Sequence, residues 1–166
     1  MVGFRLLGRT RRGLAGTSDA STGVAPGWCG RHAHGMDDTS TTGQCLCGGV
    51  RFSVAGRLRD VINCHCHRCR RFTGHHMAAT AAAREDVHVD DPESLVTWFR
   101  PVPECGYAFC SRCGASLFWR GEGAADLSIC AGTLDPPTGL QSVAAWWVSE
   151  ASDYHVRPDL PELERQ

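Results

Sequence analysis

The sequence predicts a mainly β domain built from short antiparallel strands. Two observations support this class: apolar and polar residues alternate over several short stretches, and almost no stretch has the 3.6-residue period of a helix. A separate feature of the chain is its ten cysteines, seven of which fall in three tight groups. The length of 166 residues suits one domain of ordinary size. A chain of this length can bury a hydrophobic core large enough to fold without disulfide cross-links, so the cysteines can serve another purpose.

The predicted strands follow one another from residue 50 onward. Val50, Phe52 and Val54 alternate with polar residues and form the first strand. Residues 77–83 are rich in Ala, but the stretch between Gly74 and Arg84 is short for a helix, so a strand is predicted there. The other predicted strands are 94–100 (ending at Pro101), 106–109, 115–119, 127–131 and 143–148. In the last of these, we expect one of Trp146 and Trp147 in the core and the other partly exposed.

The chain is divided into a domain and two flanking segments. Residues 1–40 are rich in Gly, Ser, Thr and Arg without periodicity, which predicts disorder. Two other interpretations are an Arg-rich organelle transit peptide and true initiation at Met36. Cys29, His32 and His34 lie in this segment and are not expected to bind metal. The domain is predicted to span residues 41–160, followed by a tail at 161–166. The stretch 153–161 is expected to be extended, because its prolines exclude a helix.

Charge and hydropathy exclude several classes of partner. All 17 basic residues are Arg. Residues 1–36 contain five Arg and one acid, Asp19, for a net charge of +4. The rest of the chain contains 12 Arg and 17 acids, for a net charge of −5. An acidic body argues against nucleic-acid binding. No stretch resembles a secretory signal or a membrane span, so we expect a cytoplasmic protein without membrane contact. Reduced thiols in that compartment favour metal binding over disulfides.

Seven cysteines divide naturally into a set of four and a set of three. A closed structural zinc site takes four ligands, whereas a catalytic site keeps three and leaves one position open. The pairs Cys45–Cys47 and Cys110–Cys113 can supply the four, with Gly114 providing a left-handed turn. Cys64, Cys66 and Cys69 then supply the three. The alternative is a second structural site completed by His65 or His67. Cys130 is expected to be a buried core residue, and Cys105 is less certain.

Three motifs carry a resemblance to a known family. Residues 43–51, reading GQCLCGGVR, resemble the opening motif of the glutathione-dependent formaldehyde-activating enzyme family. Residues 64–74, reading CHCHRCRRFTG, are similar to its central motif, and residues 109–115 are similar to its third. Gly132-Thr133-Leu134-Asp135 and the segment 147–154 also fit, so that the resemblance spans about residues 42 to 160.

The resemblance implies an Mss4-like β-tent pinned by zinc, with two zinc ions per chain. It implies a structural zinc on Cys45, Cys47, Cys110 and Cys113, and a catalytic zinc on Cys64, Cys66 and Cys69. The implied activity is that of a carbon–sulfur lyase, S-(hydroxymethyl)glutathione synthase-like, which joins formaldehyde or a related aldehyde to glutathione or another small thiol. Because the family also includes a centromere protein, a non-catalytic zinc-binding interaction module is the alternative.

Basic and titratable residues near the triplet suggest further roles. Arg68, Arg70 and Arg71 could bind a carboxylate of the thiol substrate, with exposed surface positions as the alternative. His65 and His67 are candidates for proton transfer, and His75 and His76 are weaker ones. For Tyr154 and His155, a core position at a strand end is expected rather than a place in the pocket. A thiol-based redox protein using Cys66 or Cys69 is a further alternative.

Overall fold

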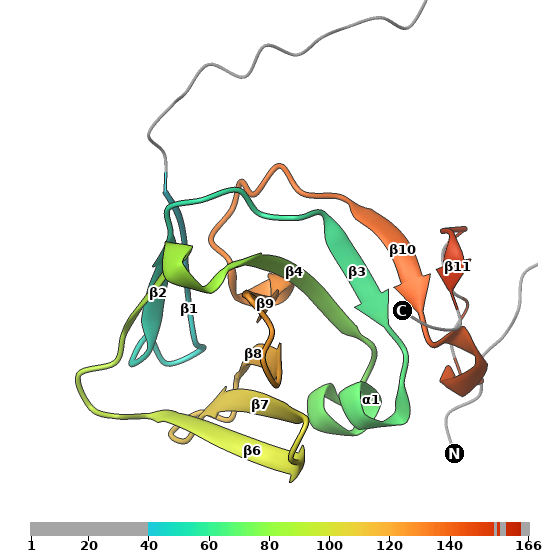
Figure 1. Ribbon diagram of the computed structural model, residues 1–166, viewed down its shortest axis with the longest axis horizontal. Helices are drawn as coiled ribbons and strands as arrows, with labels where there is room; N and C mark the ends of the chain where they lie inside the picture. Colours follow the sequence, from blue (N-terminus) through green and yellow to red (C-terminus); the bar gives the residue numbers. More distant parts are fainter. Residues whose placement is uncertain (1–39, 155, 157–158, 164–166) are drawn as a thin grey trace, which may run out of the picture. The chain divides into compact units, whose positions relative to one another are not determined.

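The computed structural model describes residues 40–154, 156 and 159–163. Residues 1–39 of the predicted N-terminal extension, with Cys29, His32 and His34, lie outside them, as does His155. The predicted domain limits remain a prediction. The described strands form two sheets (Figure 1). In chain order, the three antiparallel strands of the small sheet are β1 (Thr41–Gln44), β2 (Arg51–Val54) and β5 (Val87–Asp90).

The large sheet has eight strands, in the spatial order β11-β10-β3-β4-β9-β8-β7-β6. Their bounds are β3 (Val61–Cys64), β4 (Met77–Ala83), β6 (Val96–Val102), β7 (Cys105–Cys110), β8 (Ser116–Gly121), β9 (Asp126–Cys130), β10 (Ser142–Trp146) and β11 (Glu162–Leu163). Within the described ranges there is one α-helix, α1 (His67–Thr73), and three short 3-10 turns at Arg84–Asp86, Ala131–Thr133 and Val148–Glu150. The mainly β class with short, largely antiparallel strands is confirmed.

Several details differ from the prediction. Residues 67–73 form α1, and β10 runs parallel to β3 and β11. β6 continues through Pro101 to Val102, which the large sheet tolerates because β6 is its edge strand and Pro101 lies where the register with β7 shifts. β10 ends at Trp146 because Trp147 takes a left-handed conformation with φ 58°. Both tryptophans are half-buried, so the prediction of a core tryptophan and a partly exposed one is wrong.

Alternation along the strands gives the large sheet two different faces. One face is filled by large apolar side chains, including Phe118, Leu127 and Ile129, which pack against β2 of the small sheet. There the rings of Phe52 and Phe118 meet edge to face, with centroids 5.2 Å apart. The other face carries smaller residues together with Cys69 of α1, Met77 and Tyr107. The first face closes the core, and the second remains available for a site.

The helix α1 lies between the end of β3 and the start of β4, close to β7 (Figure 1). Its Phe72 ring contacts Tyr107 of β7, with centroids 4.8 Å apart. Gly74 ends the helix in a left-handed conformation, φ 81°, and its N–H donates to the Arg70 carbonyl. Within the described ranges, no helix has the length and apolar character needed to cross a membrane.

Candidate metal centres

The first cysteine cluster joins two turns that are far apart in the sequence. Two cysteines lie at the turn between β1 and β2 and two at the turn between β7 and β8: Cys45, Cys47, Cys110 and Cys113. Gly48 and Gly114 have φ of 71° and 74°, a conformation that glycine adopts without steric cost. Each glycine N–H donates to the carbonyl of the first cysteine of its turn, at 3.0 and 2.8 Å. The two turns are therefore built alike, and the left-handed Gly114 was predicted.

The four sulfur atoms of this cluster fit one metal ion. All of them lie within 4.8 Å of one another, with 3.4 Å between Cys45 and Cys47 and 3.9 Å between Cys47 and Cys110. A tetrahedral zinc with Zn–S bonds of about 2.3 Å places its sulfurs about 3.8 Å apart. The Val50 N–H also donates to Cys45 Sγ at 3.3 Å, an interaction that favours the thiolate. The donor set is that of a closed four-thiolate site.

The second cluster is assembled where β3 passes into α1. The sulfurs of Cys64, Cys66 and Cys69 lie within 4.8 Å of one another. Cys64 ends β3, and Cys66 is the N-cap of α1, where its sulfur accepts a hydrogen bond from the Cys69 N–H at 3.4 Å. Residues three apart share one side of a helix, so α1 brings Cys66 and Cys69 together. This set contains three sulfurs, and none of the described His, Asp or Glu residues completes it.

The three thiols stabilise negative charge on the middle one. Hydrogen bonds from Cys64 and then from Cys69 lower the pKa of Cys66 to about 2. The same contact with Cys66 raises the pKa of Cys64 to about 11, and contacts with Cys64 and Cys66 raise that of Cys69. A bound cation would take the place of the two remaining thiol protons. The chemistry of the donors therefore fits a metal ion on three thiolates.

The second cluster opens onto a cavity of about 790 Å³. All three of its cysteines line this cavity, whereas none of the four cysteines of the first cluster does. The cavity lies on the face of the large sheet that carries small residues, and its lining includes Trp119, Trp146 and Trp147. The two clusters thus differ in accessibility as well as in the number of ligands.

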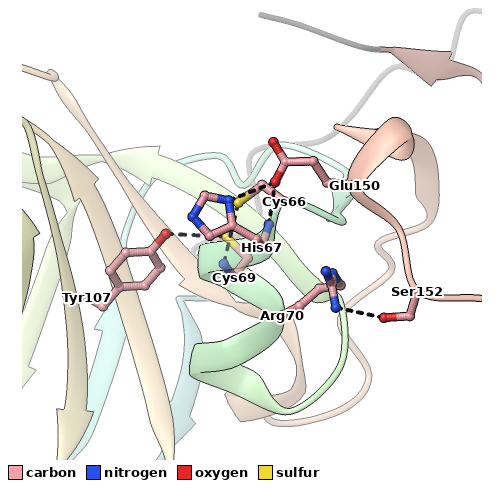
Figure 2. A network of polar contacts seen from close by, with 7 residues as sticks. All are labelled: Cys66, His67, Cys69, Arg70, Tyr107, Glu150 and Ser152. Carbon is pink, nitrogen blue, oxygen red and sulfur yellow. Dashed lines mark hydrogen bonds and ion pairs between the residues drawn. The ribbon is translucent and has the colours of Figure 1, made fainter.

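Tyr107 is a residue of the site that the sequence did not reveal. Its side chain is 3% exposed, and its hydroxyl group lies 3.6 Å from Cys69 Sγ (Figure 2). Burial and the neighbouring Cys69 sulfur raise the Tyr107 pKa, so the hydroxyl stays protonated. The alternation of the predicted strand 106–109 placed Tyr107 on one face of the sheet, but nothing in the sequence indicated which face would contain the cavity.

The segment after β10 holds α1 at two points (Figure 2). Glu150 Oε2 accepts a hydrogen bond from the His67 backbone N–H at 2.6 Å and lies 2.9 Å from His67 Nδ1. Hydrogen bonds from the His67 backbone and side chain hold the Glu150 pKa below its usual range. Farther along, a terminal guanidinium nitrogen of Arg70 donates to Ser152 Oγ at 2.9 Å. Glu150 was not predicted as a site residue, because it lies 83 positions from its partner.

The structure separates the three predicted substrate-binding arginines. Arg68 lines the cavity, Arg70 is half-buried against Ser152, and Arg71 is exposed and outside the cavity lining. Of these three, Arg68 is placed to meet a ligand in the cavity.

The predicted histidines are likewise separated. His67 lines the cavity, whereas His65 is 1% exposed and does not belong to its lining; the His65 ring packs against His76 instead. His75 also packs against His76 and forms a hydrogen bond with Tyr154 at 2.9 Å. Tyr154 is 63% exposed, so the predicted core position is wrong. Cys130 is buried as predicted, and Cys105 is a buried residue in the cavity wall.

Comparisons with known proteins identify a similar fold and a family. A crystal structure of a Rhodobacter sphaeroides protein has a similar fold, with a TM-score of 0.50 and 24% identity over 59% of this chain and 91% of that chain. A family model described as glutathione-dependent formaldehyde-activating enzyme matches residues 40–150, well over half of the chain. The chain therefore belongs to the glutathione-dependent formaldehyde-activating enzyme family.

Proposed function

We propose that this chain is a zinc-dependent carbon–sulfur lyase, S-(hydroxymethyl)glutathione synthase-like, which joins an aldehyde to glutathione or another small thiol. The observation that carries this proposal is the opening of the three-cysteine cluster onto the cavity, while the four-cysteine cluster stays outside it. Family membership supports formaldehyde and glutathione as the reference substrates. The proposal includes two zinc ions per chain, one structural and one catalytic. The cytoplasmic location, and the absence of nucleic-acid and membrane partners, stay predictions.

The two clusters receive different roles in this proposal. Cys45, Cys47, Cys110 and Cys113 would hold the structural ion, and Cys64, Cys66 and Cys69 would hold the catalytic one. A zinc ion with an open position supplies Lewis acidity, which favours the deprotonated form of a thiol at neutral pH. Three cysteines leave room for such a position, whereas four close the tetrahedron.

The addition itself needs no oxidant or reductant. The thiol loses its proton, its sulfur forms the new C–S bond at the carbonyl carbon, and the C=O π pair moves to oxygen. The resulting alkoxide takes up a proton, so atoms and charges balance. His67 lines the cavity and is held by Glu150, which suits it to accept and return that proton. The protonated Tyr107 hydroxyl can donate to developing negative charge on oxygen.

Arg68 is the arginine we assign to the thiol substrate. It follows His67 at the start of α1, is exposed, and lines the cavity. Its guanidinium group can bind a carboxylate of glutathione while the substrate sulfur approaches the cysteine cluster.

Exchange spectroscopy tests the proposed activity. Formaldehyde and glutathione are mixed at equilibrium with the zinc-loaded chain, and NMR measures the exchange rate between the free compounds and their adduct. We expect the wild type to accelerate this exchange over the uncatalysed rate, and Cys66→Ser to lose most of the acceleration. A wild-type rate equal to the uncatalysed one would remove the proposed activity and leave the family fold intact.

A further inference from the structure

The cavity beside the three-cysteine cluster is much larger than formaldehyde requires. Its volume of about 790 Å³ falls in the ~300–1,000 Å³ range typical of pockets that enclose whole small molecules. Formaldehyde has only a carbon and an oxygen as heavy atoms. The remaining space can hold part of the thiol substrate or a larger carbonyl substrate, and the lining favours one of the two.

One side of the cavity, its floor, is formed by paired residues of β3 and β4, with alanines away from the cysteine cluster. Met77 pairs with Cys64 at the cluster, Ala79 pairs with Ile62 one step farther, and Ala81 lies one step beyond Ala79 on the same face of β4. At ~3.3 Å per residue, the four steps from Met77 to Ala81 span about 13 Å. The alternate residues Met77, Ala79 and Ala81 line the cavity, and so do their partners Cys64 and Ile62. The floor therefore leads away from the cysteines for a length that formaldehyde does not use.

The neighbouring strands extend this floor with one small and two aromatic residues. Ser128 of β9 pairs with Ala81 on one side and with Trp119 of β8 on the other, and Trp119 pairs with Tyr107 of β7. These four residues form a row across four adjacent strands, and each of them lines the cavity. Trp146 and Trp147 add further aromatic surface. Alanine side chains give the space, and the aromatic rings give it an apolar wall.

The charges of the lining disfavour a deep position for glutathione, which carries two carboxylates and one ammonium group. Among the described residues that line the cavity, the acids are Glu104, Asp126 and Glu150, and the Arg and Lys cations are Arg59 and Arg68 alone. Arg59, at the far end, already donates to the carbonyls of Asp60 and Ala79. Three thiolates around a divalent ion add a further formal charge of −1. A carboxylate is thus favoured only near Arg68, beside the cluster.

From this arrangement we propose that the cavity binds the apolar side chain of the carbonyl substrate, an aliphatic or aromatic aldehyde larger than formaldehyde. This inference rests on the proposed function and names its substrate class. The thiol lies toward Arg68, the carbonyl carbon lies at the cysteine cluster, and the aldehyde side chain extends over Ala79 and Ala81. The bonds formed and broken are those of the addition already described, with the side chain unchanged.

The wild-type chain tests this inference through a homologous series of aldehydes. Butanal and hexanal have nearly the same carbonyl reactivity and differ in length, so their kcat/KM values for adduct exchange with glutathione report burial of the side chain. Each buried methylene is expected to raise kcat/KM by up to about fourfold. Equal kcat/KM values for butanal and hexanal, with acceleration of the formaldehyde reaction, would overturn the inference and leave the proposed function standing. Absence of acceleration with any aldehyde would instead overturn the proposed function.

A binding measurement provides a readout that does not depend on turnover. Hexanol cannot form the adduct, and its binding is expected to change the fluorescence of the tryptophans that line the cavity. Ala81→Leu fills the far part of the floor, and we expect it to weaken hexanol binding at least tenfold. The same variant should lower the ratio of kcat/KM for hexanal to that for formaldehyde by at least tenfold.

Ala78→Leu is the matched control. Ala78 is half-buried on β4 but points to the opposite face and is absent from the cavity lining. We expect it to leave both hexanol affinity and the substrate ratio within about twofold of wild type. Unchanged hexanol binding and an unchanged ratio in folded Ala81→Leu would contradict the inference. The aldehyde series on the wild type gives a decision even if Ala81→Leu does not fold.

Discussion

The Tyr107 hydroxyl contacts the three-cysteine cluster directly, through the sulfur of Cys69. It faces Cys69 Sγ at 3.6 Å from a strand that packs on α1 through the Phe72 ring. Its raised pKa keeps the proton on oxygen, so it can donate a hydrogen bond throughout the neutral range. A buried phenol beside a thiolate cluster has a clear structural use as well, since it satisfies a sulfur lone pair. Kinetics separates the two roles.

Tyr107→Phe removes this donor and keeps the ring. If the hydroxyl stabilises negative charge that develops on the substrate oxygen, kcat should fall by about 100-fold with a much smaller change in KM. Exchange NMR with formaldehyde and glutathione measures both values. Tyr154→Phe is the matched control, because it removes the hydroxyl of the other tyrosine, which is exposed and outside the cavity lining; its kcat should stay within about twofold. A folded, zinc-loaded Tyr107→Phe chain with wild-type kcat would show that the hydroxyl is only structural.

At the scale of elements, the helix α1 depends on a carboxylate that lies 83 positions away in the sequence. Glu150 binds the first N–H of α1 and the His67 ring together. A negative charge at this end favours the helix dipole, by roughly 0.3–1 kcal/mol for a partly exposed group. The contact holds the helix that carries Cys66 and Cys69 and fixes the orientation of His67. It connects the segment after β10 to the cysteine cluster.

Glu150→Gln keeps an oxygen acceptor and removes the charge. We expect the free energy of unfolding to fall by about 0.5 kcal/mol at pH 7, measured by urea denaturation of the zinc-loaded chain. The Glu150 pKa is lowered in the folded state, so its charge contributes stability above the unfolded pKa of about 4.3, and that stability is lost only as the pH falls through the lower folded value. The destabilisation of the variant relative to wild type should therefore persist from pH 7 to pH 6. A difference that vanishes within this range would contradict the assignment.

The elements also explain which features the sequence could predict. Strands were predictable where local alternation sets them, as in β2, and the left-handed Gly114 of the turn between β7 and β8 follows from the same short-range reasoning. The helix α1 was not predicted, because its seven residues are too few to show a period and its N-cap is a cysteine side chain rather than Ser, Thr, Asp or Asn. The parallel pairing of β10 with β3 and the Glu150–His67 contact join residues about 80 positions apart. Local sequence patterns carry no information on such pairings.

For the whole molecule, the two cysteine clusters differ in what they connect. The four-cysteine cluster joins a turn of the small sheet to a turn of the large sheet, beside the core that lies between them. The three-cysteine cluster lies within ten residues at the end of one strand and the start of one helix. Loss of the first should loosen the packing of one sheet on the other, whereas loss of the second should affect α1 and the cavity. Stability and activity are thus expected to respond differently to the two clusters.

Single Cys→Ser substitutions test this division. Cys66→Ser should lower the zinc content from about two ions per chain to about one, with loss of activity and little change in the unfolding midpoint. Cys110→Ser should also lose one zinc, but it should cost on the order of 4 kcal/mol, because a closed metal site contributes directly to folding and Cys110 is fully buried. Zinc content is measured by elemental analysis under reducing conditions, and stability by thermal unfolding of the same samples. Cys130→Ser, at a buried cysteine outside both clusters, is the control that should keep both ions. Global unfolding of Cys66→Ser together with a stable Cys110→Ser would reverse the assignment of the two clusters, because the triplet would then be the one that holds the fold.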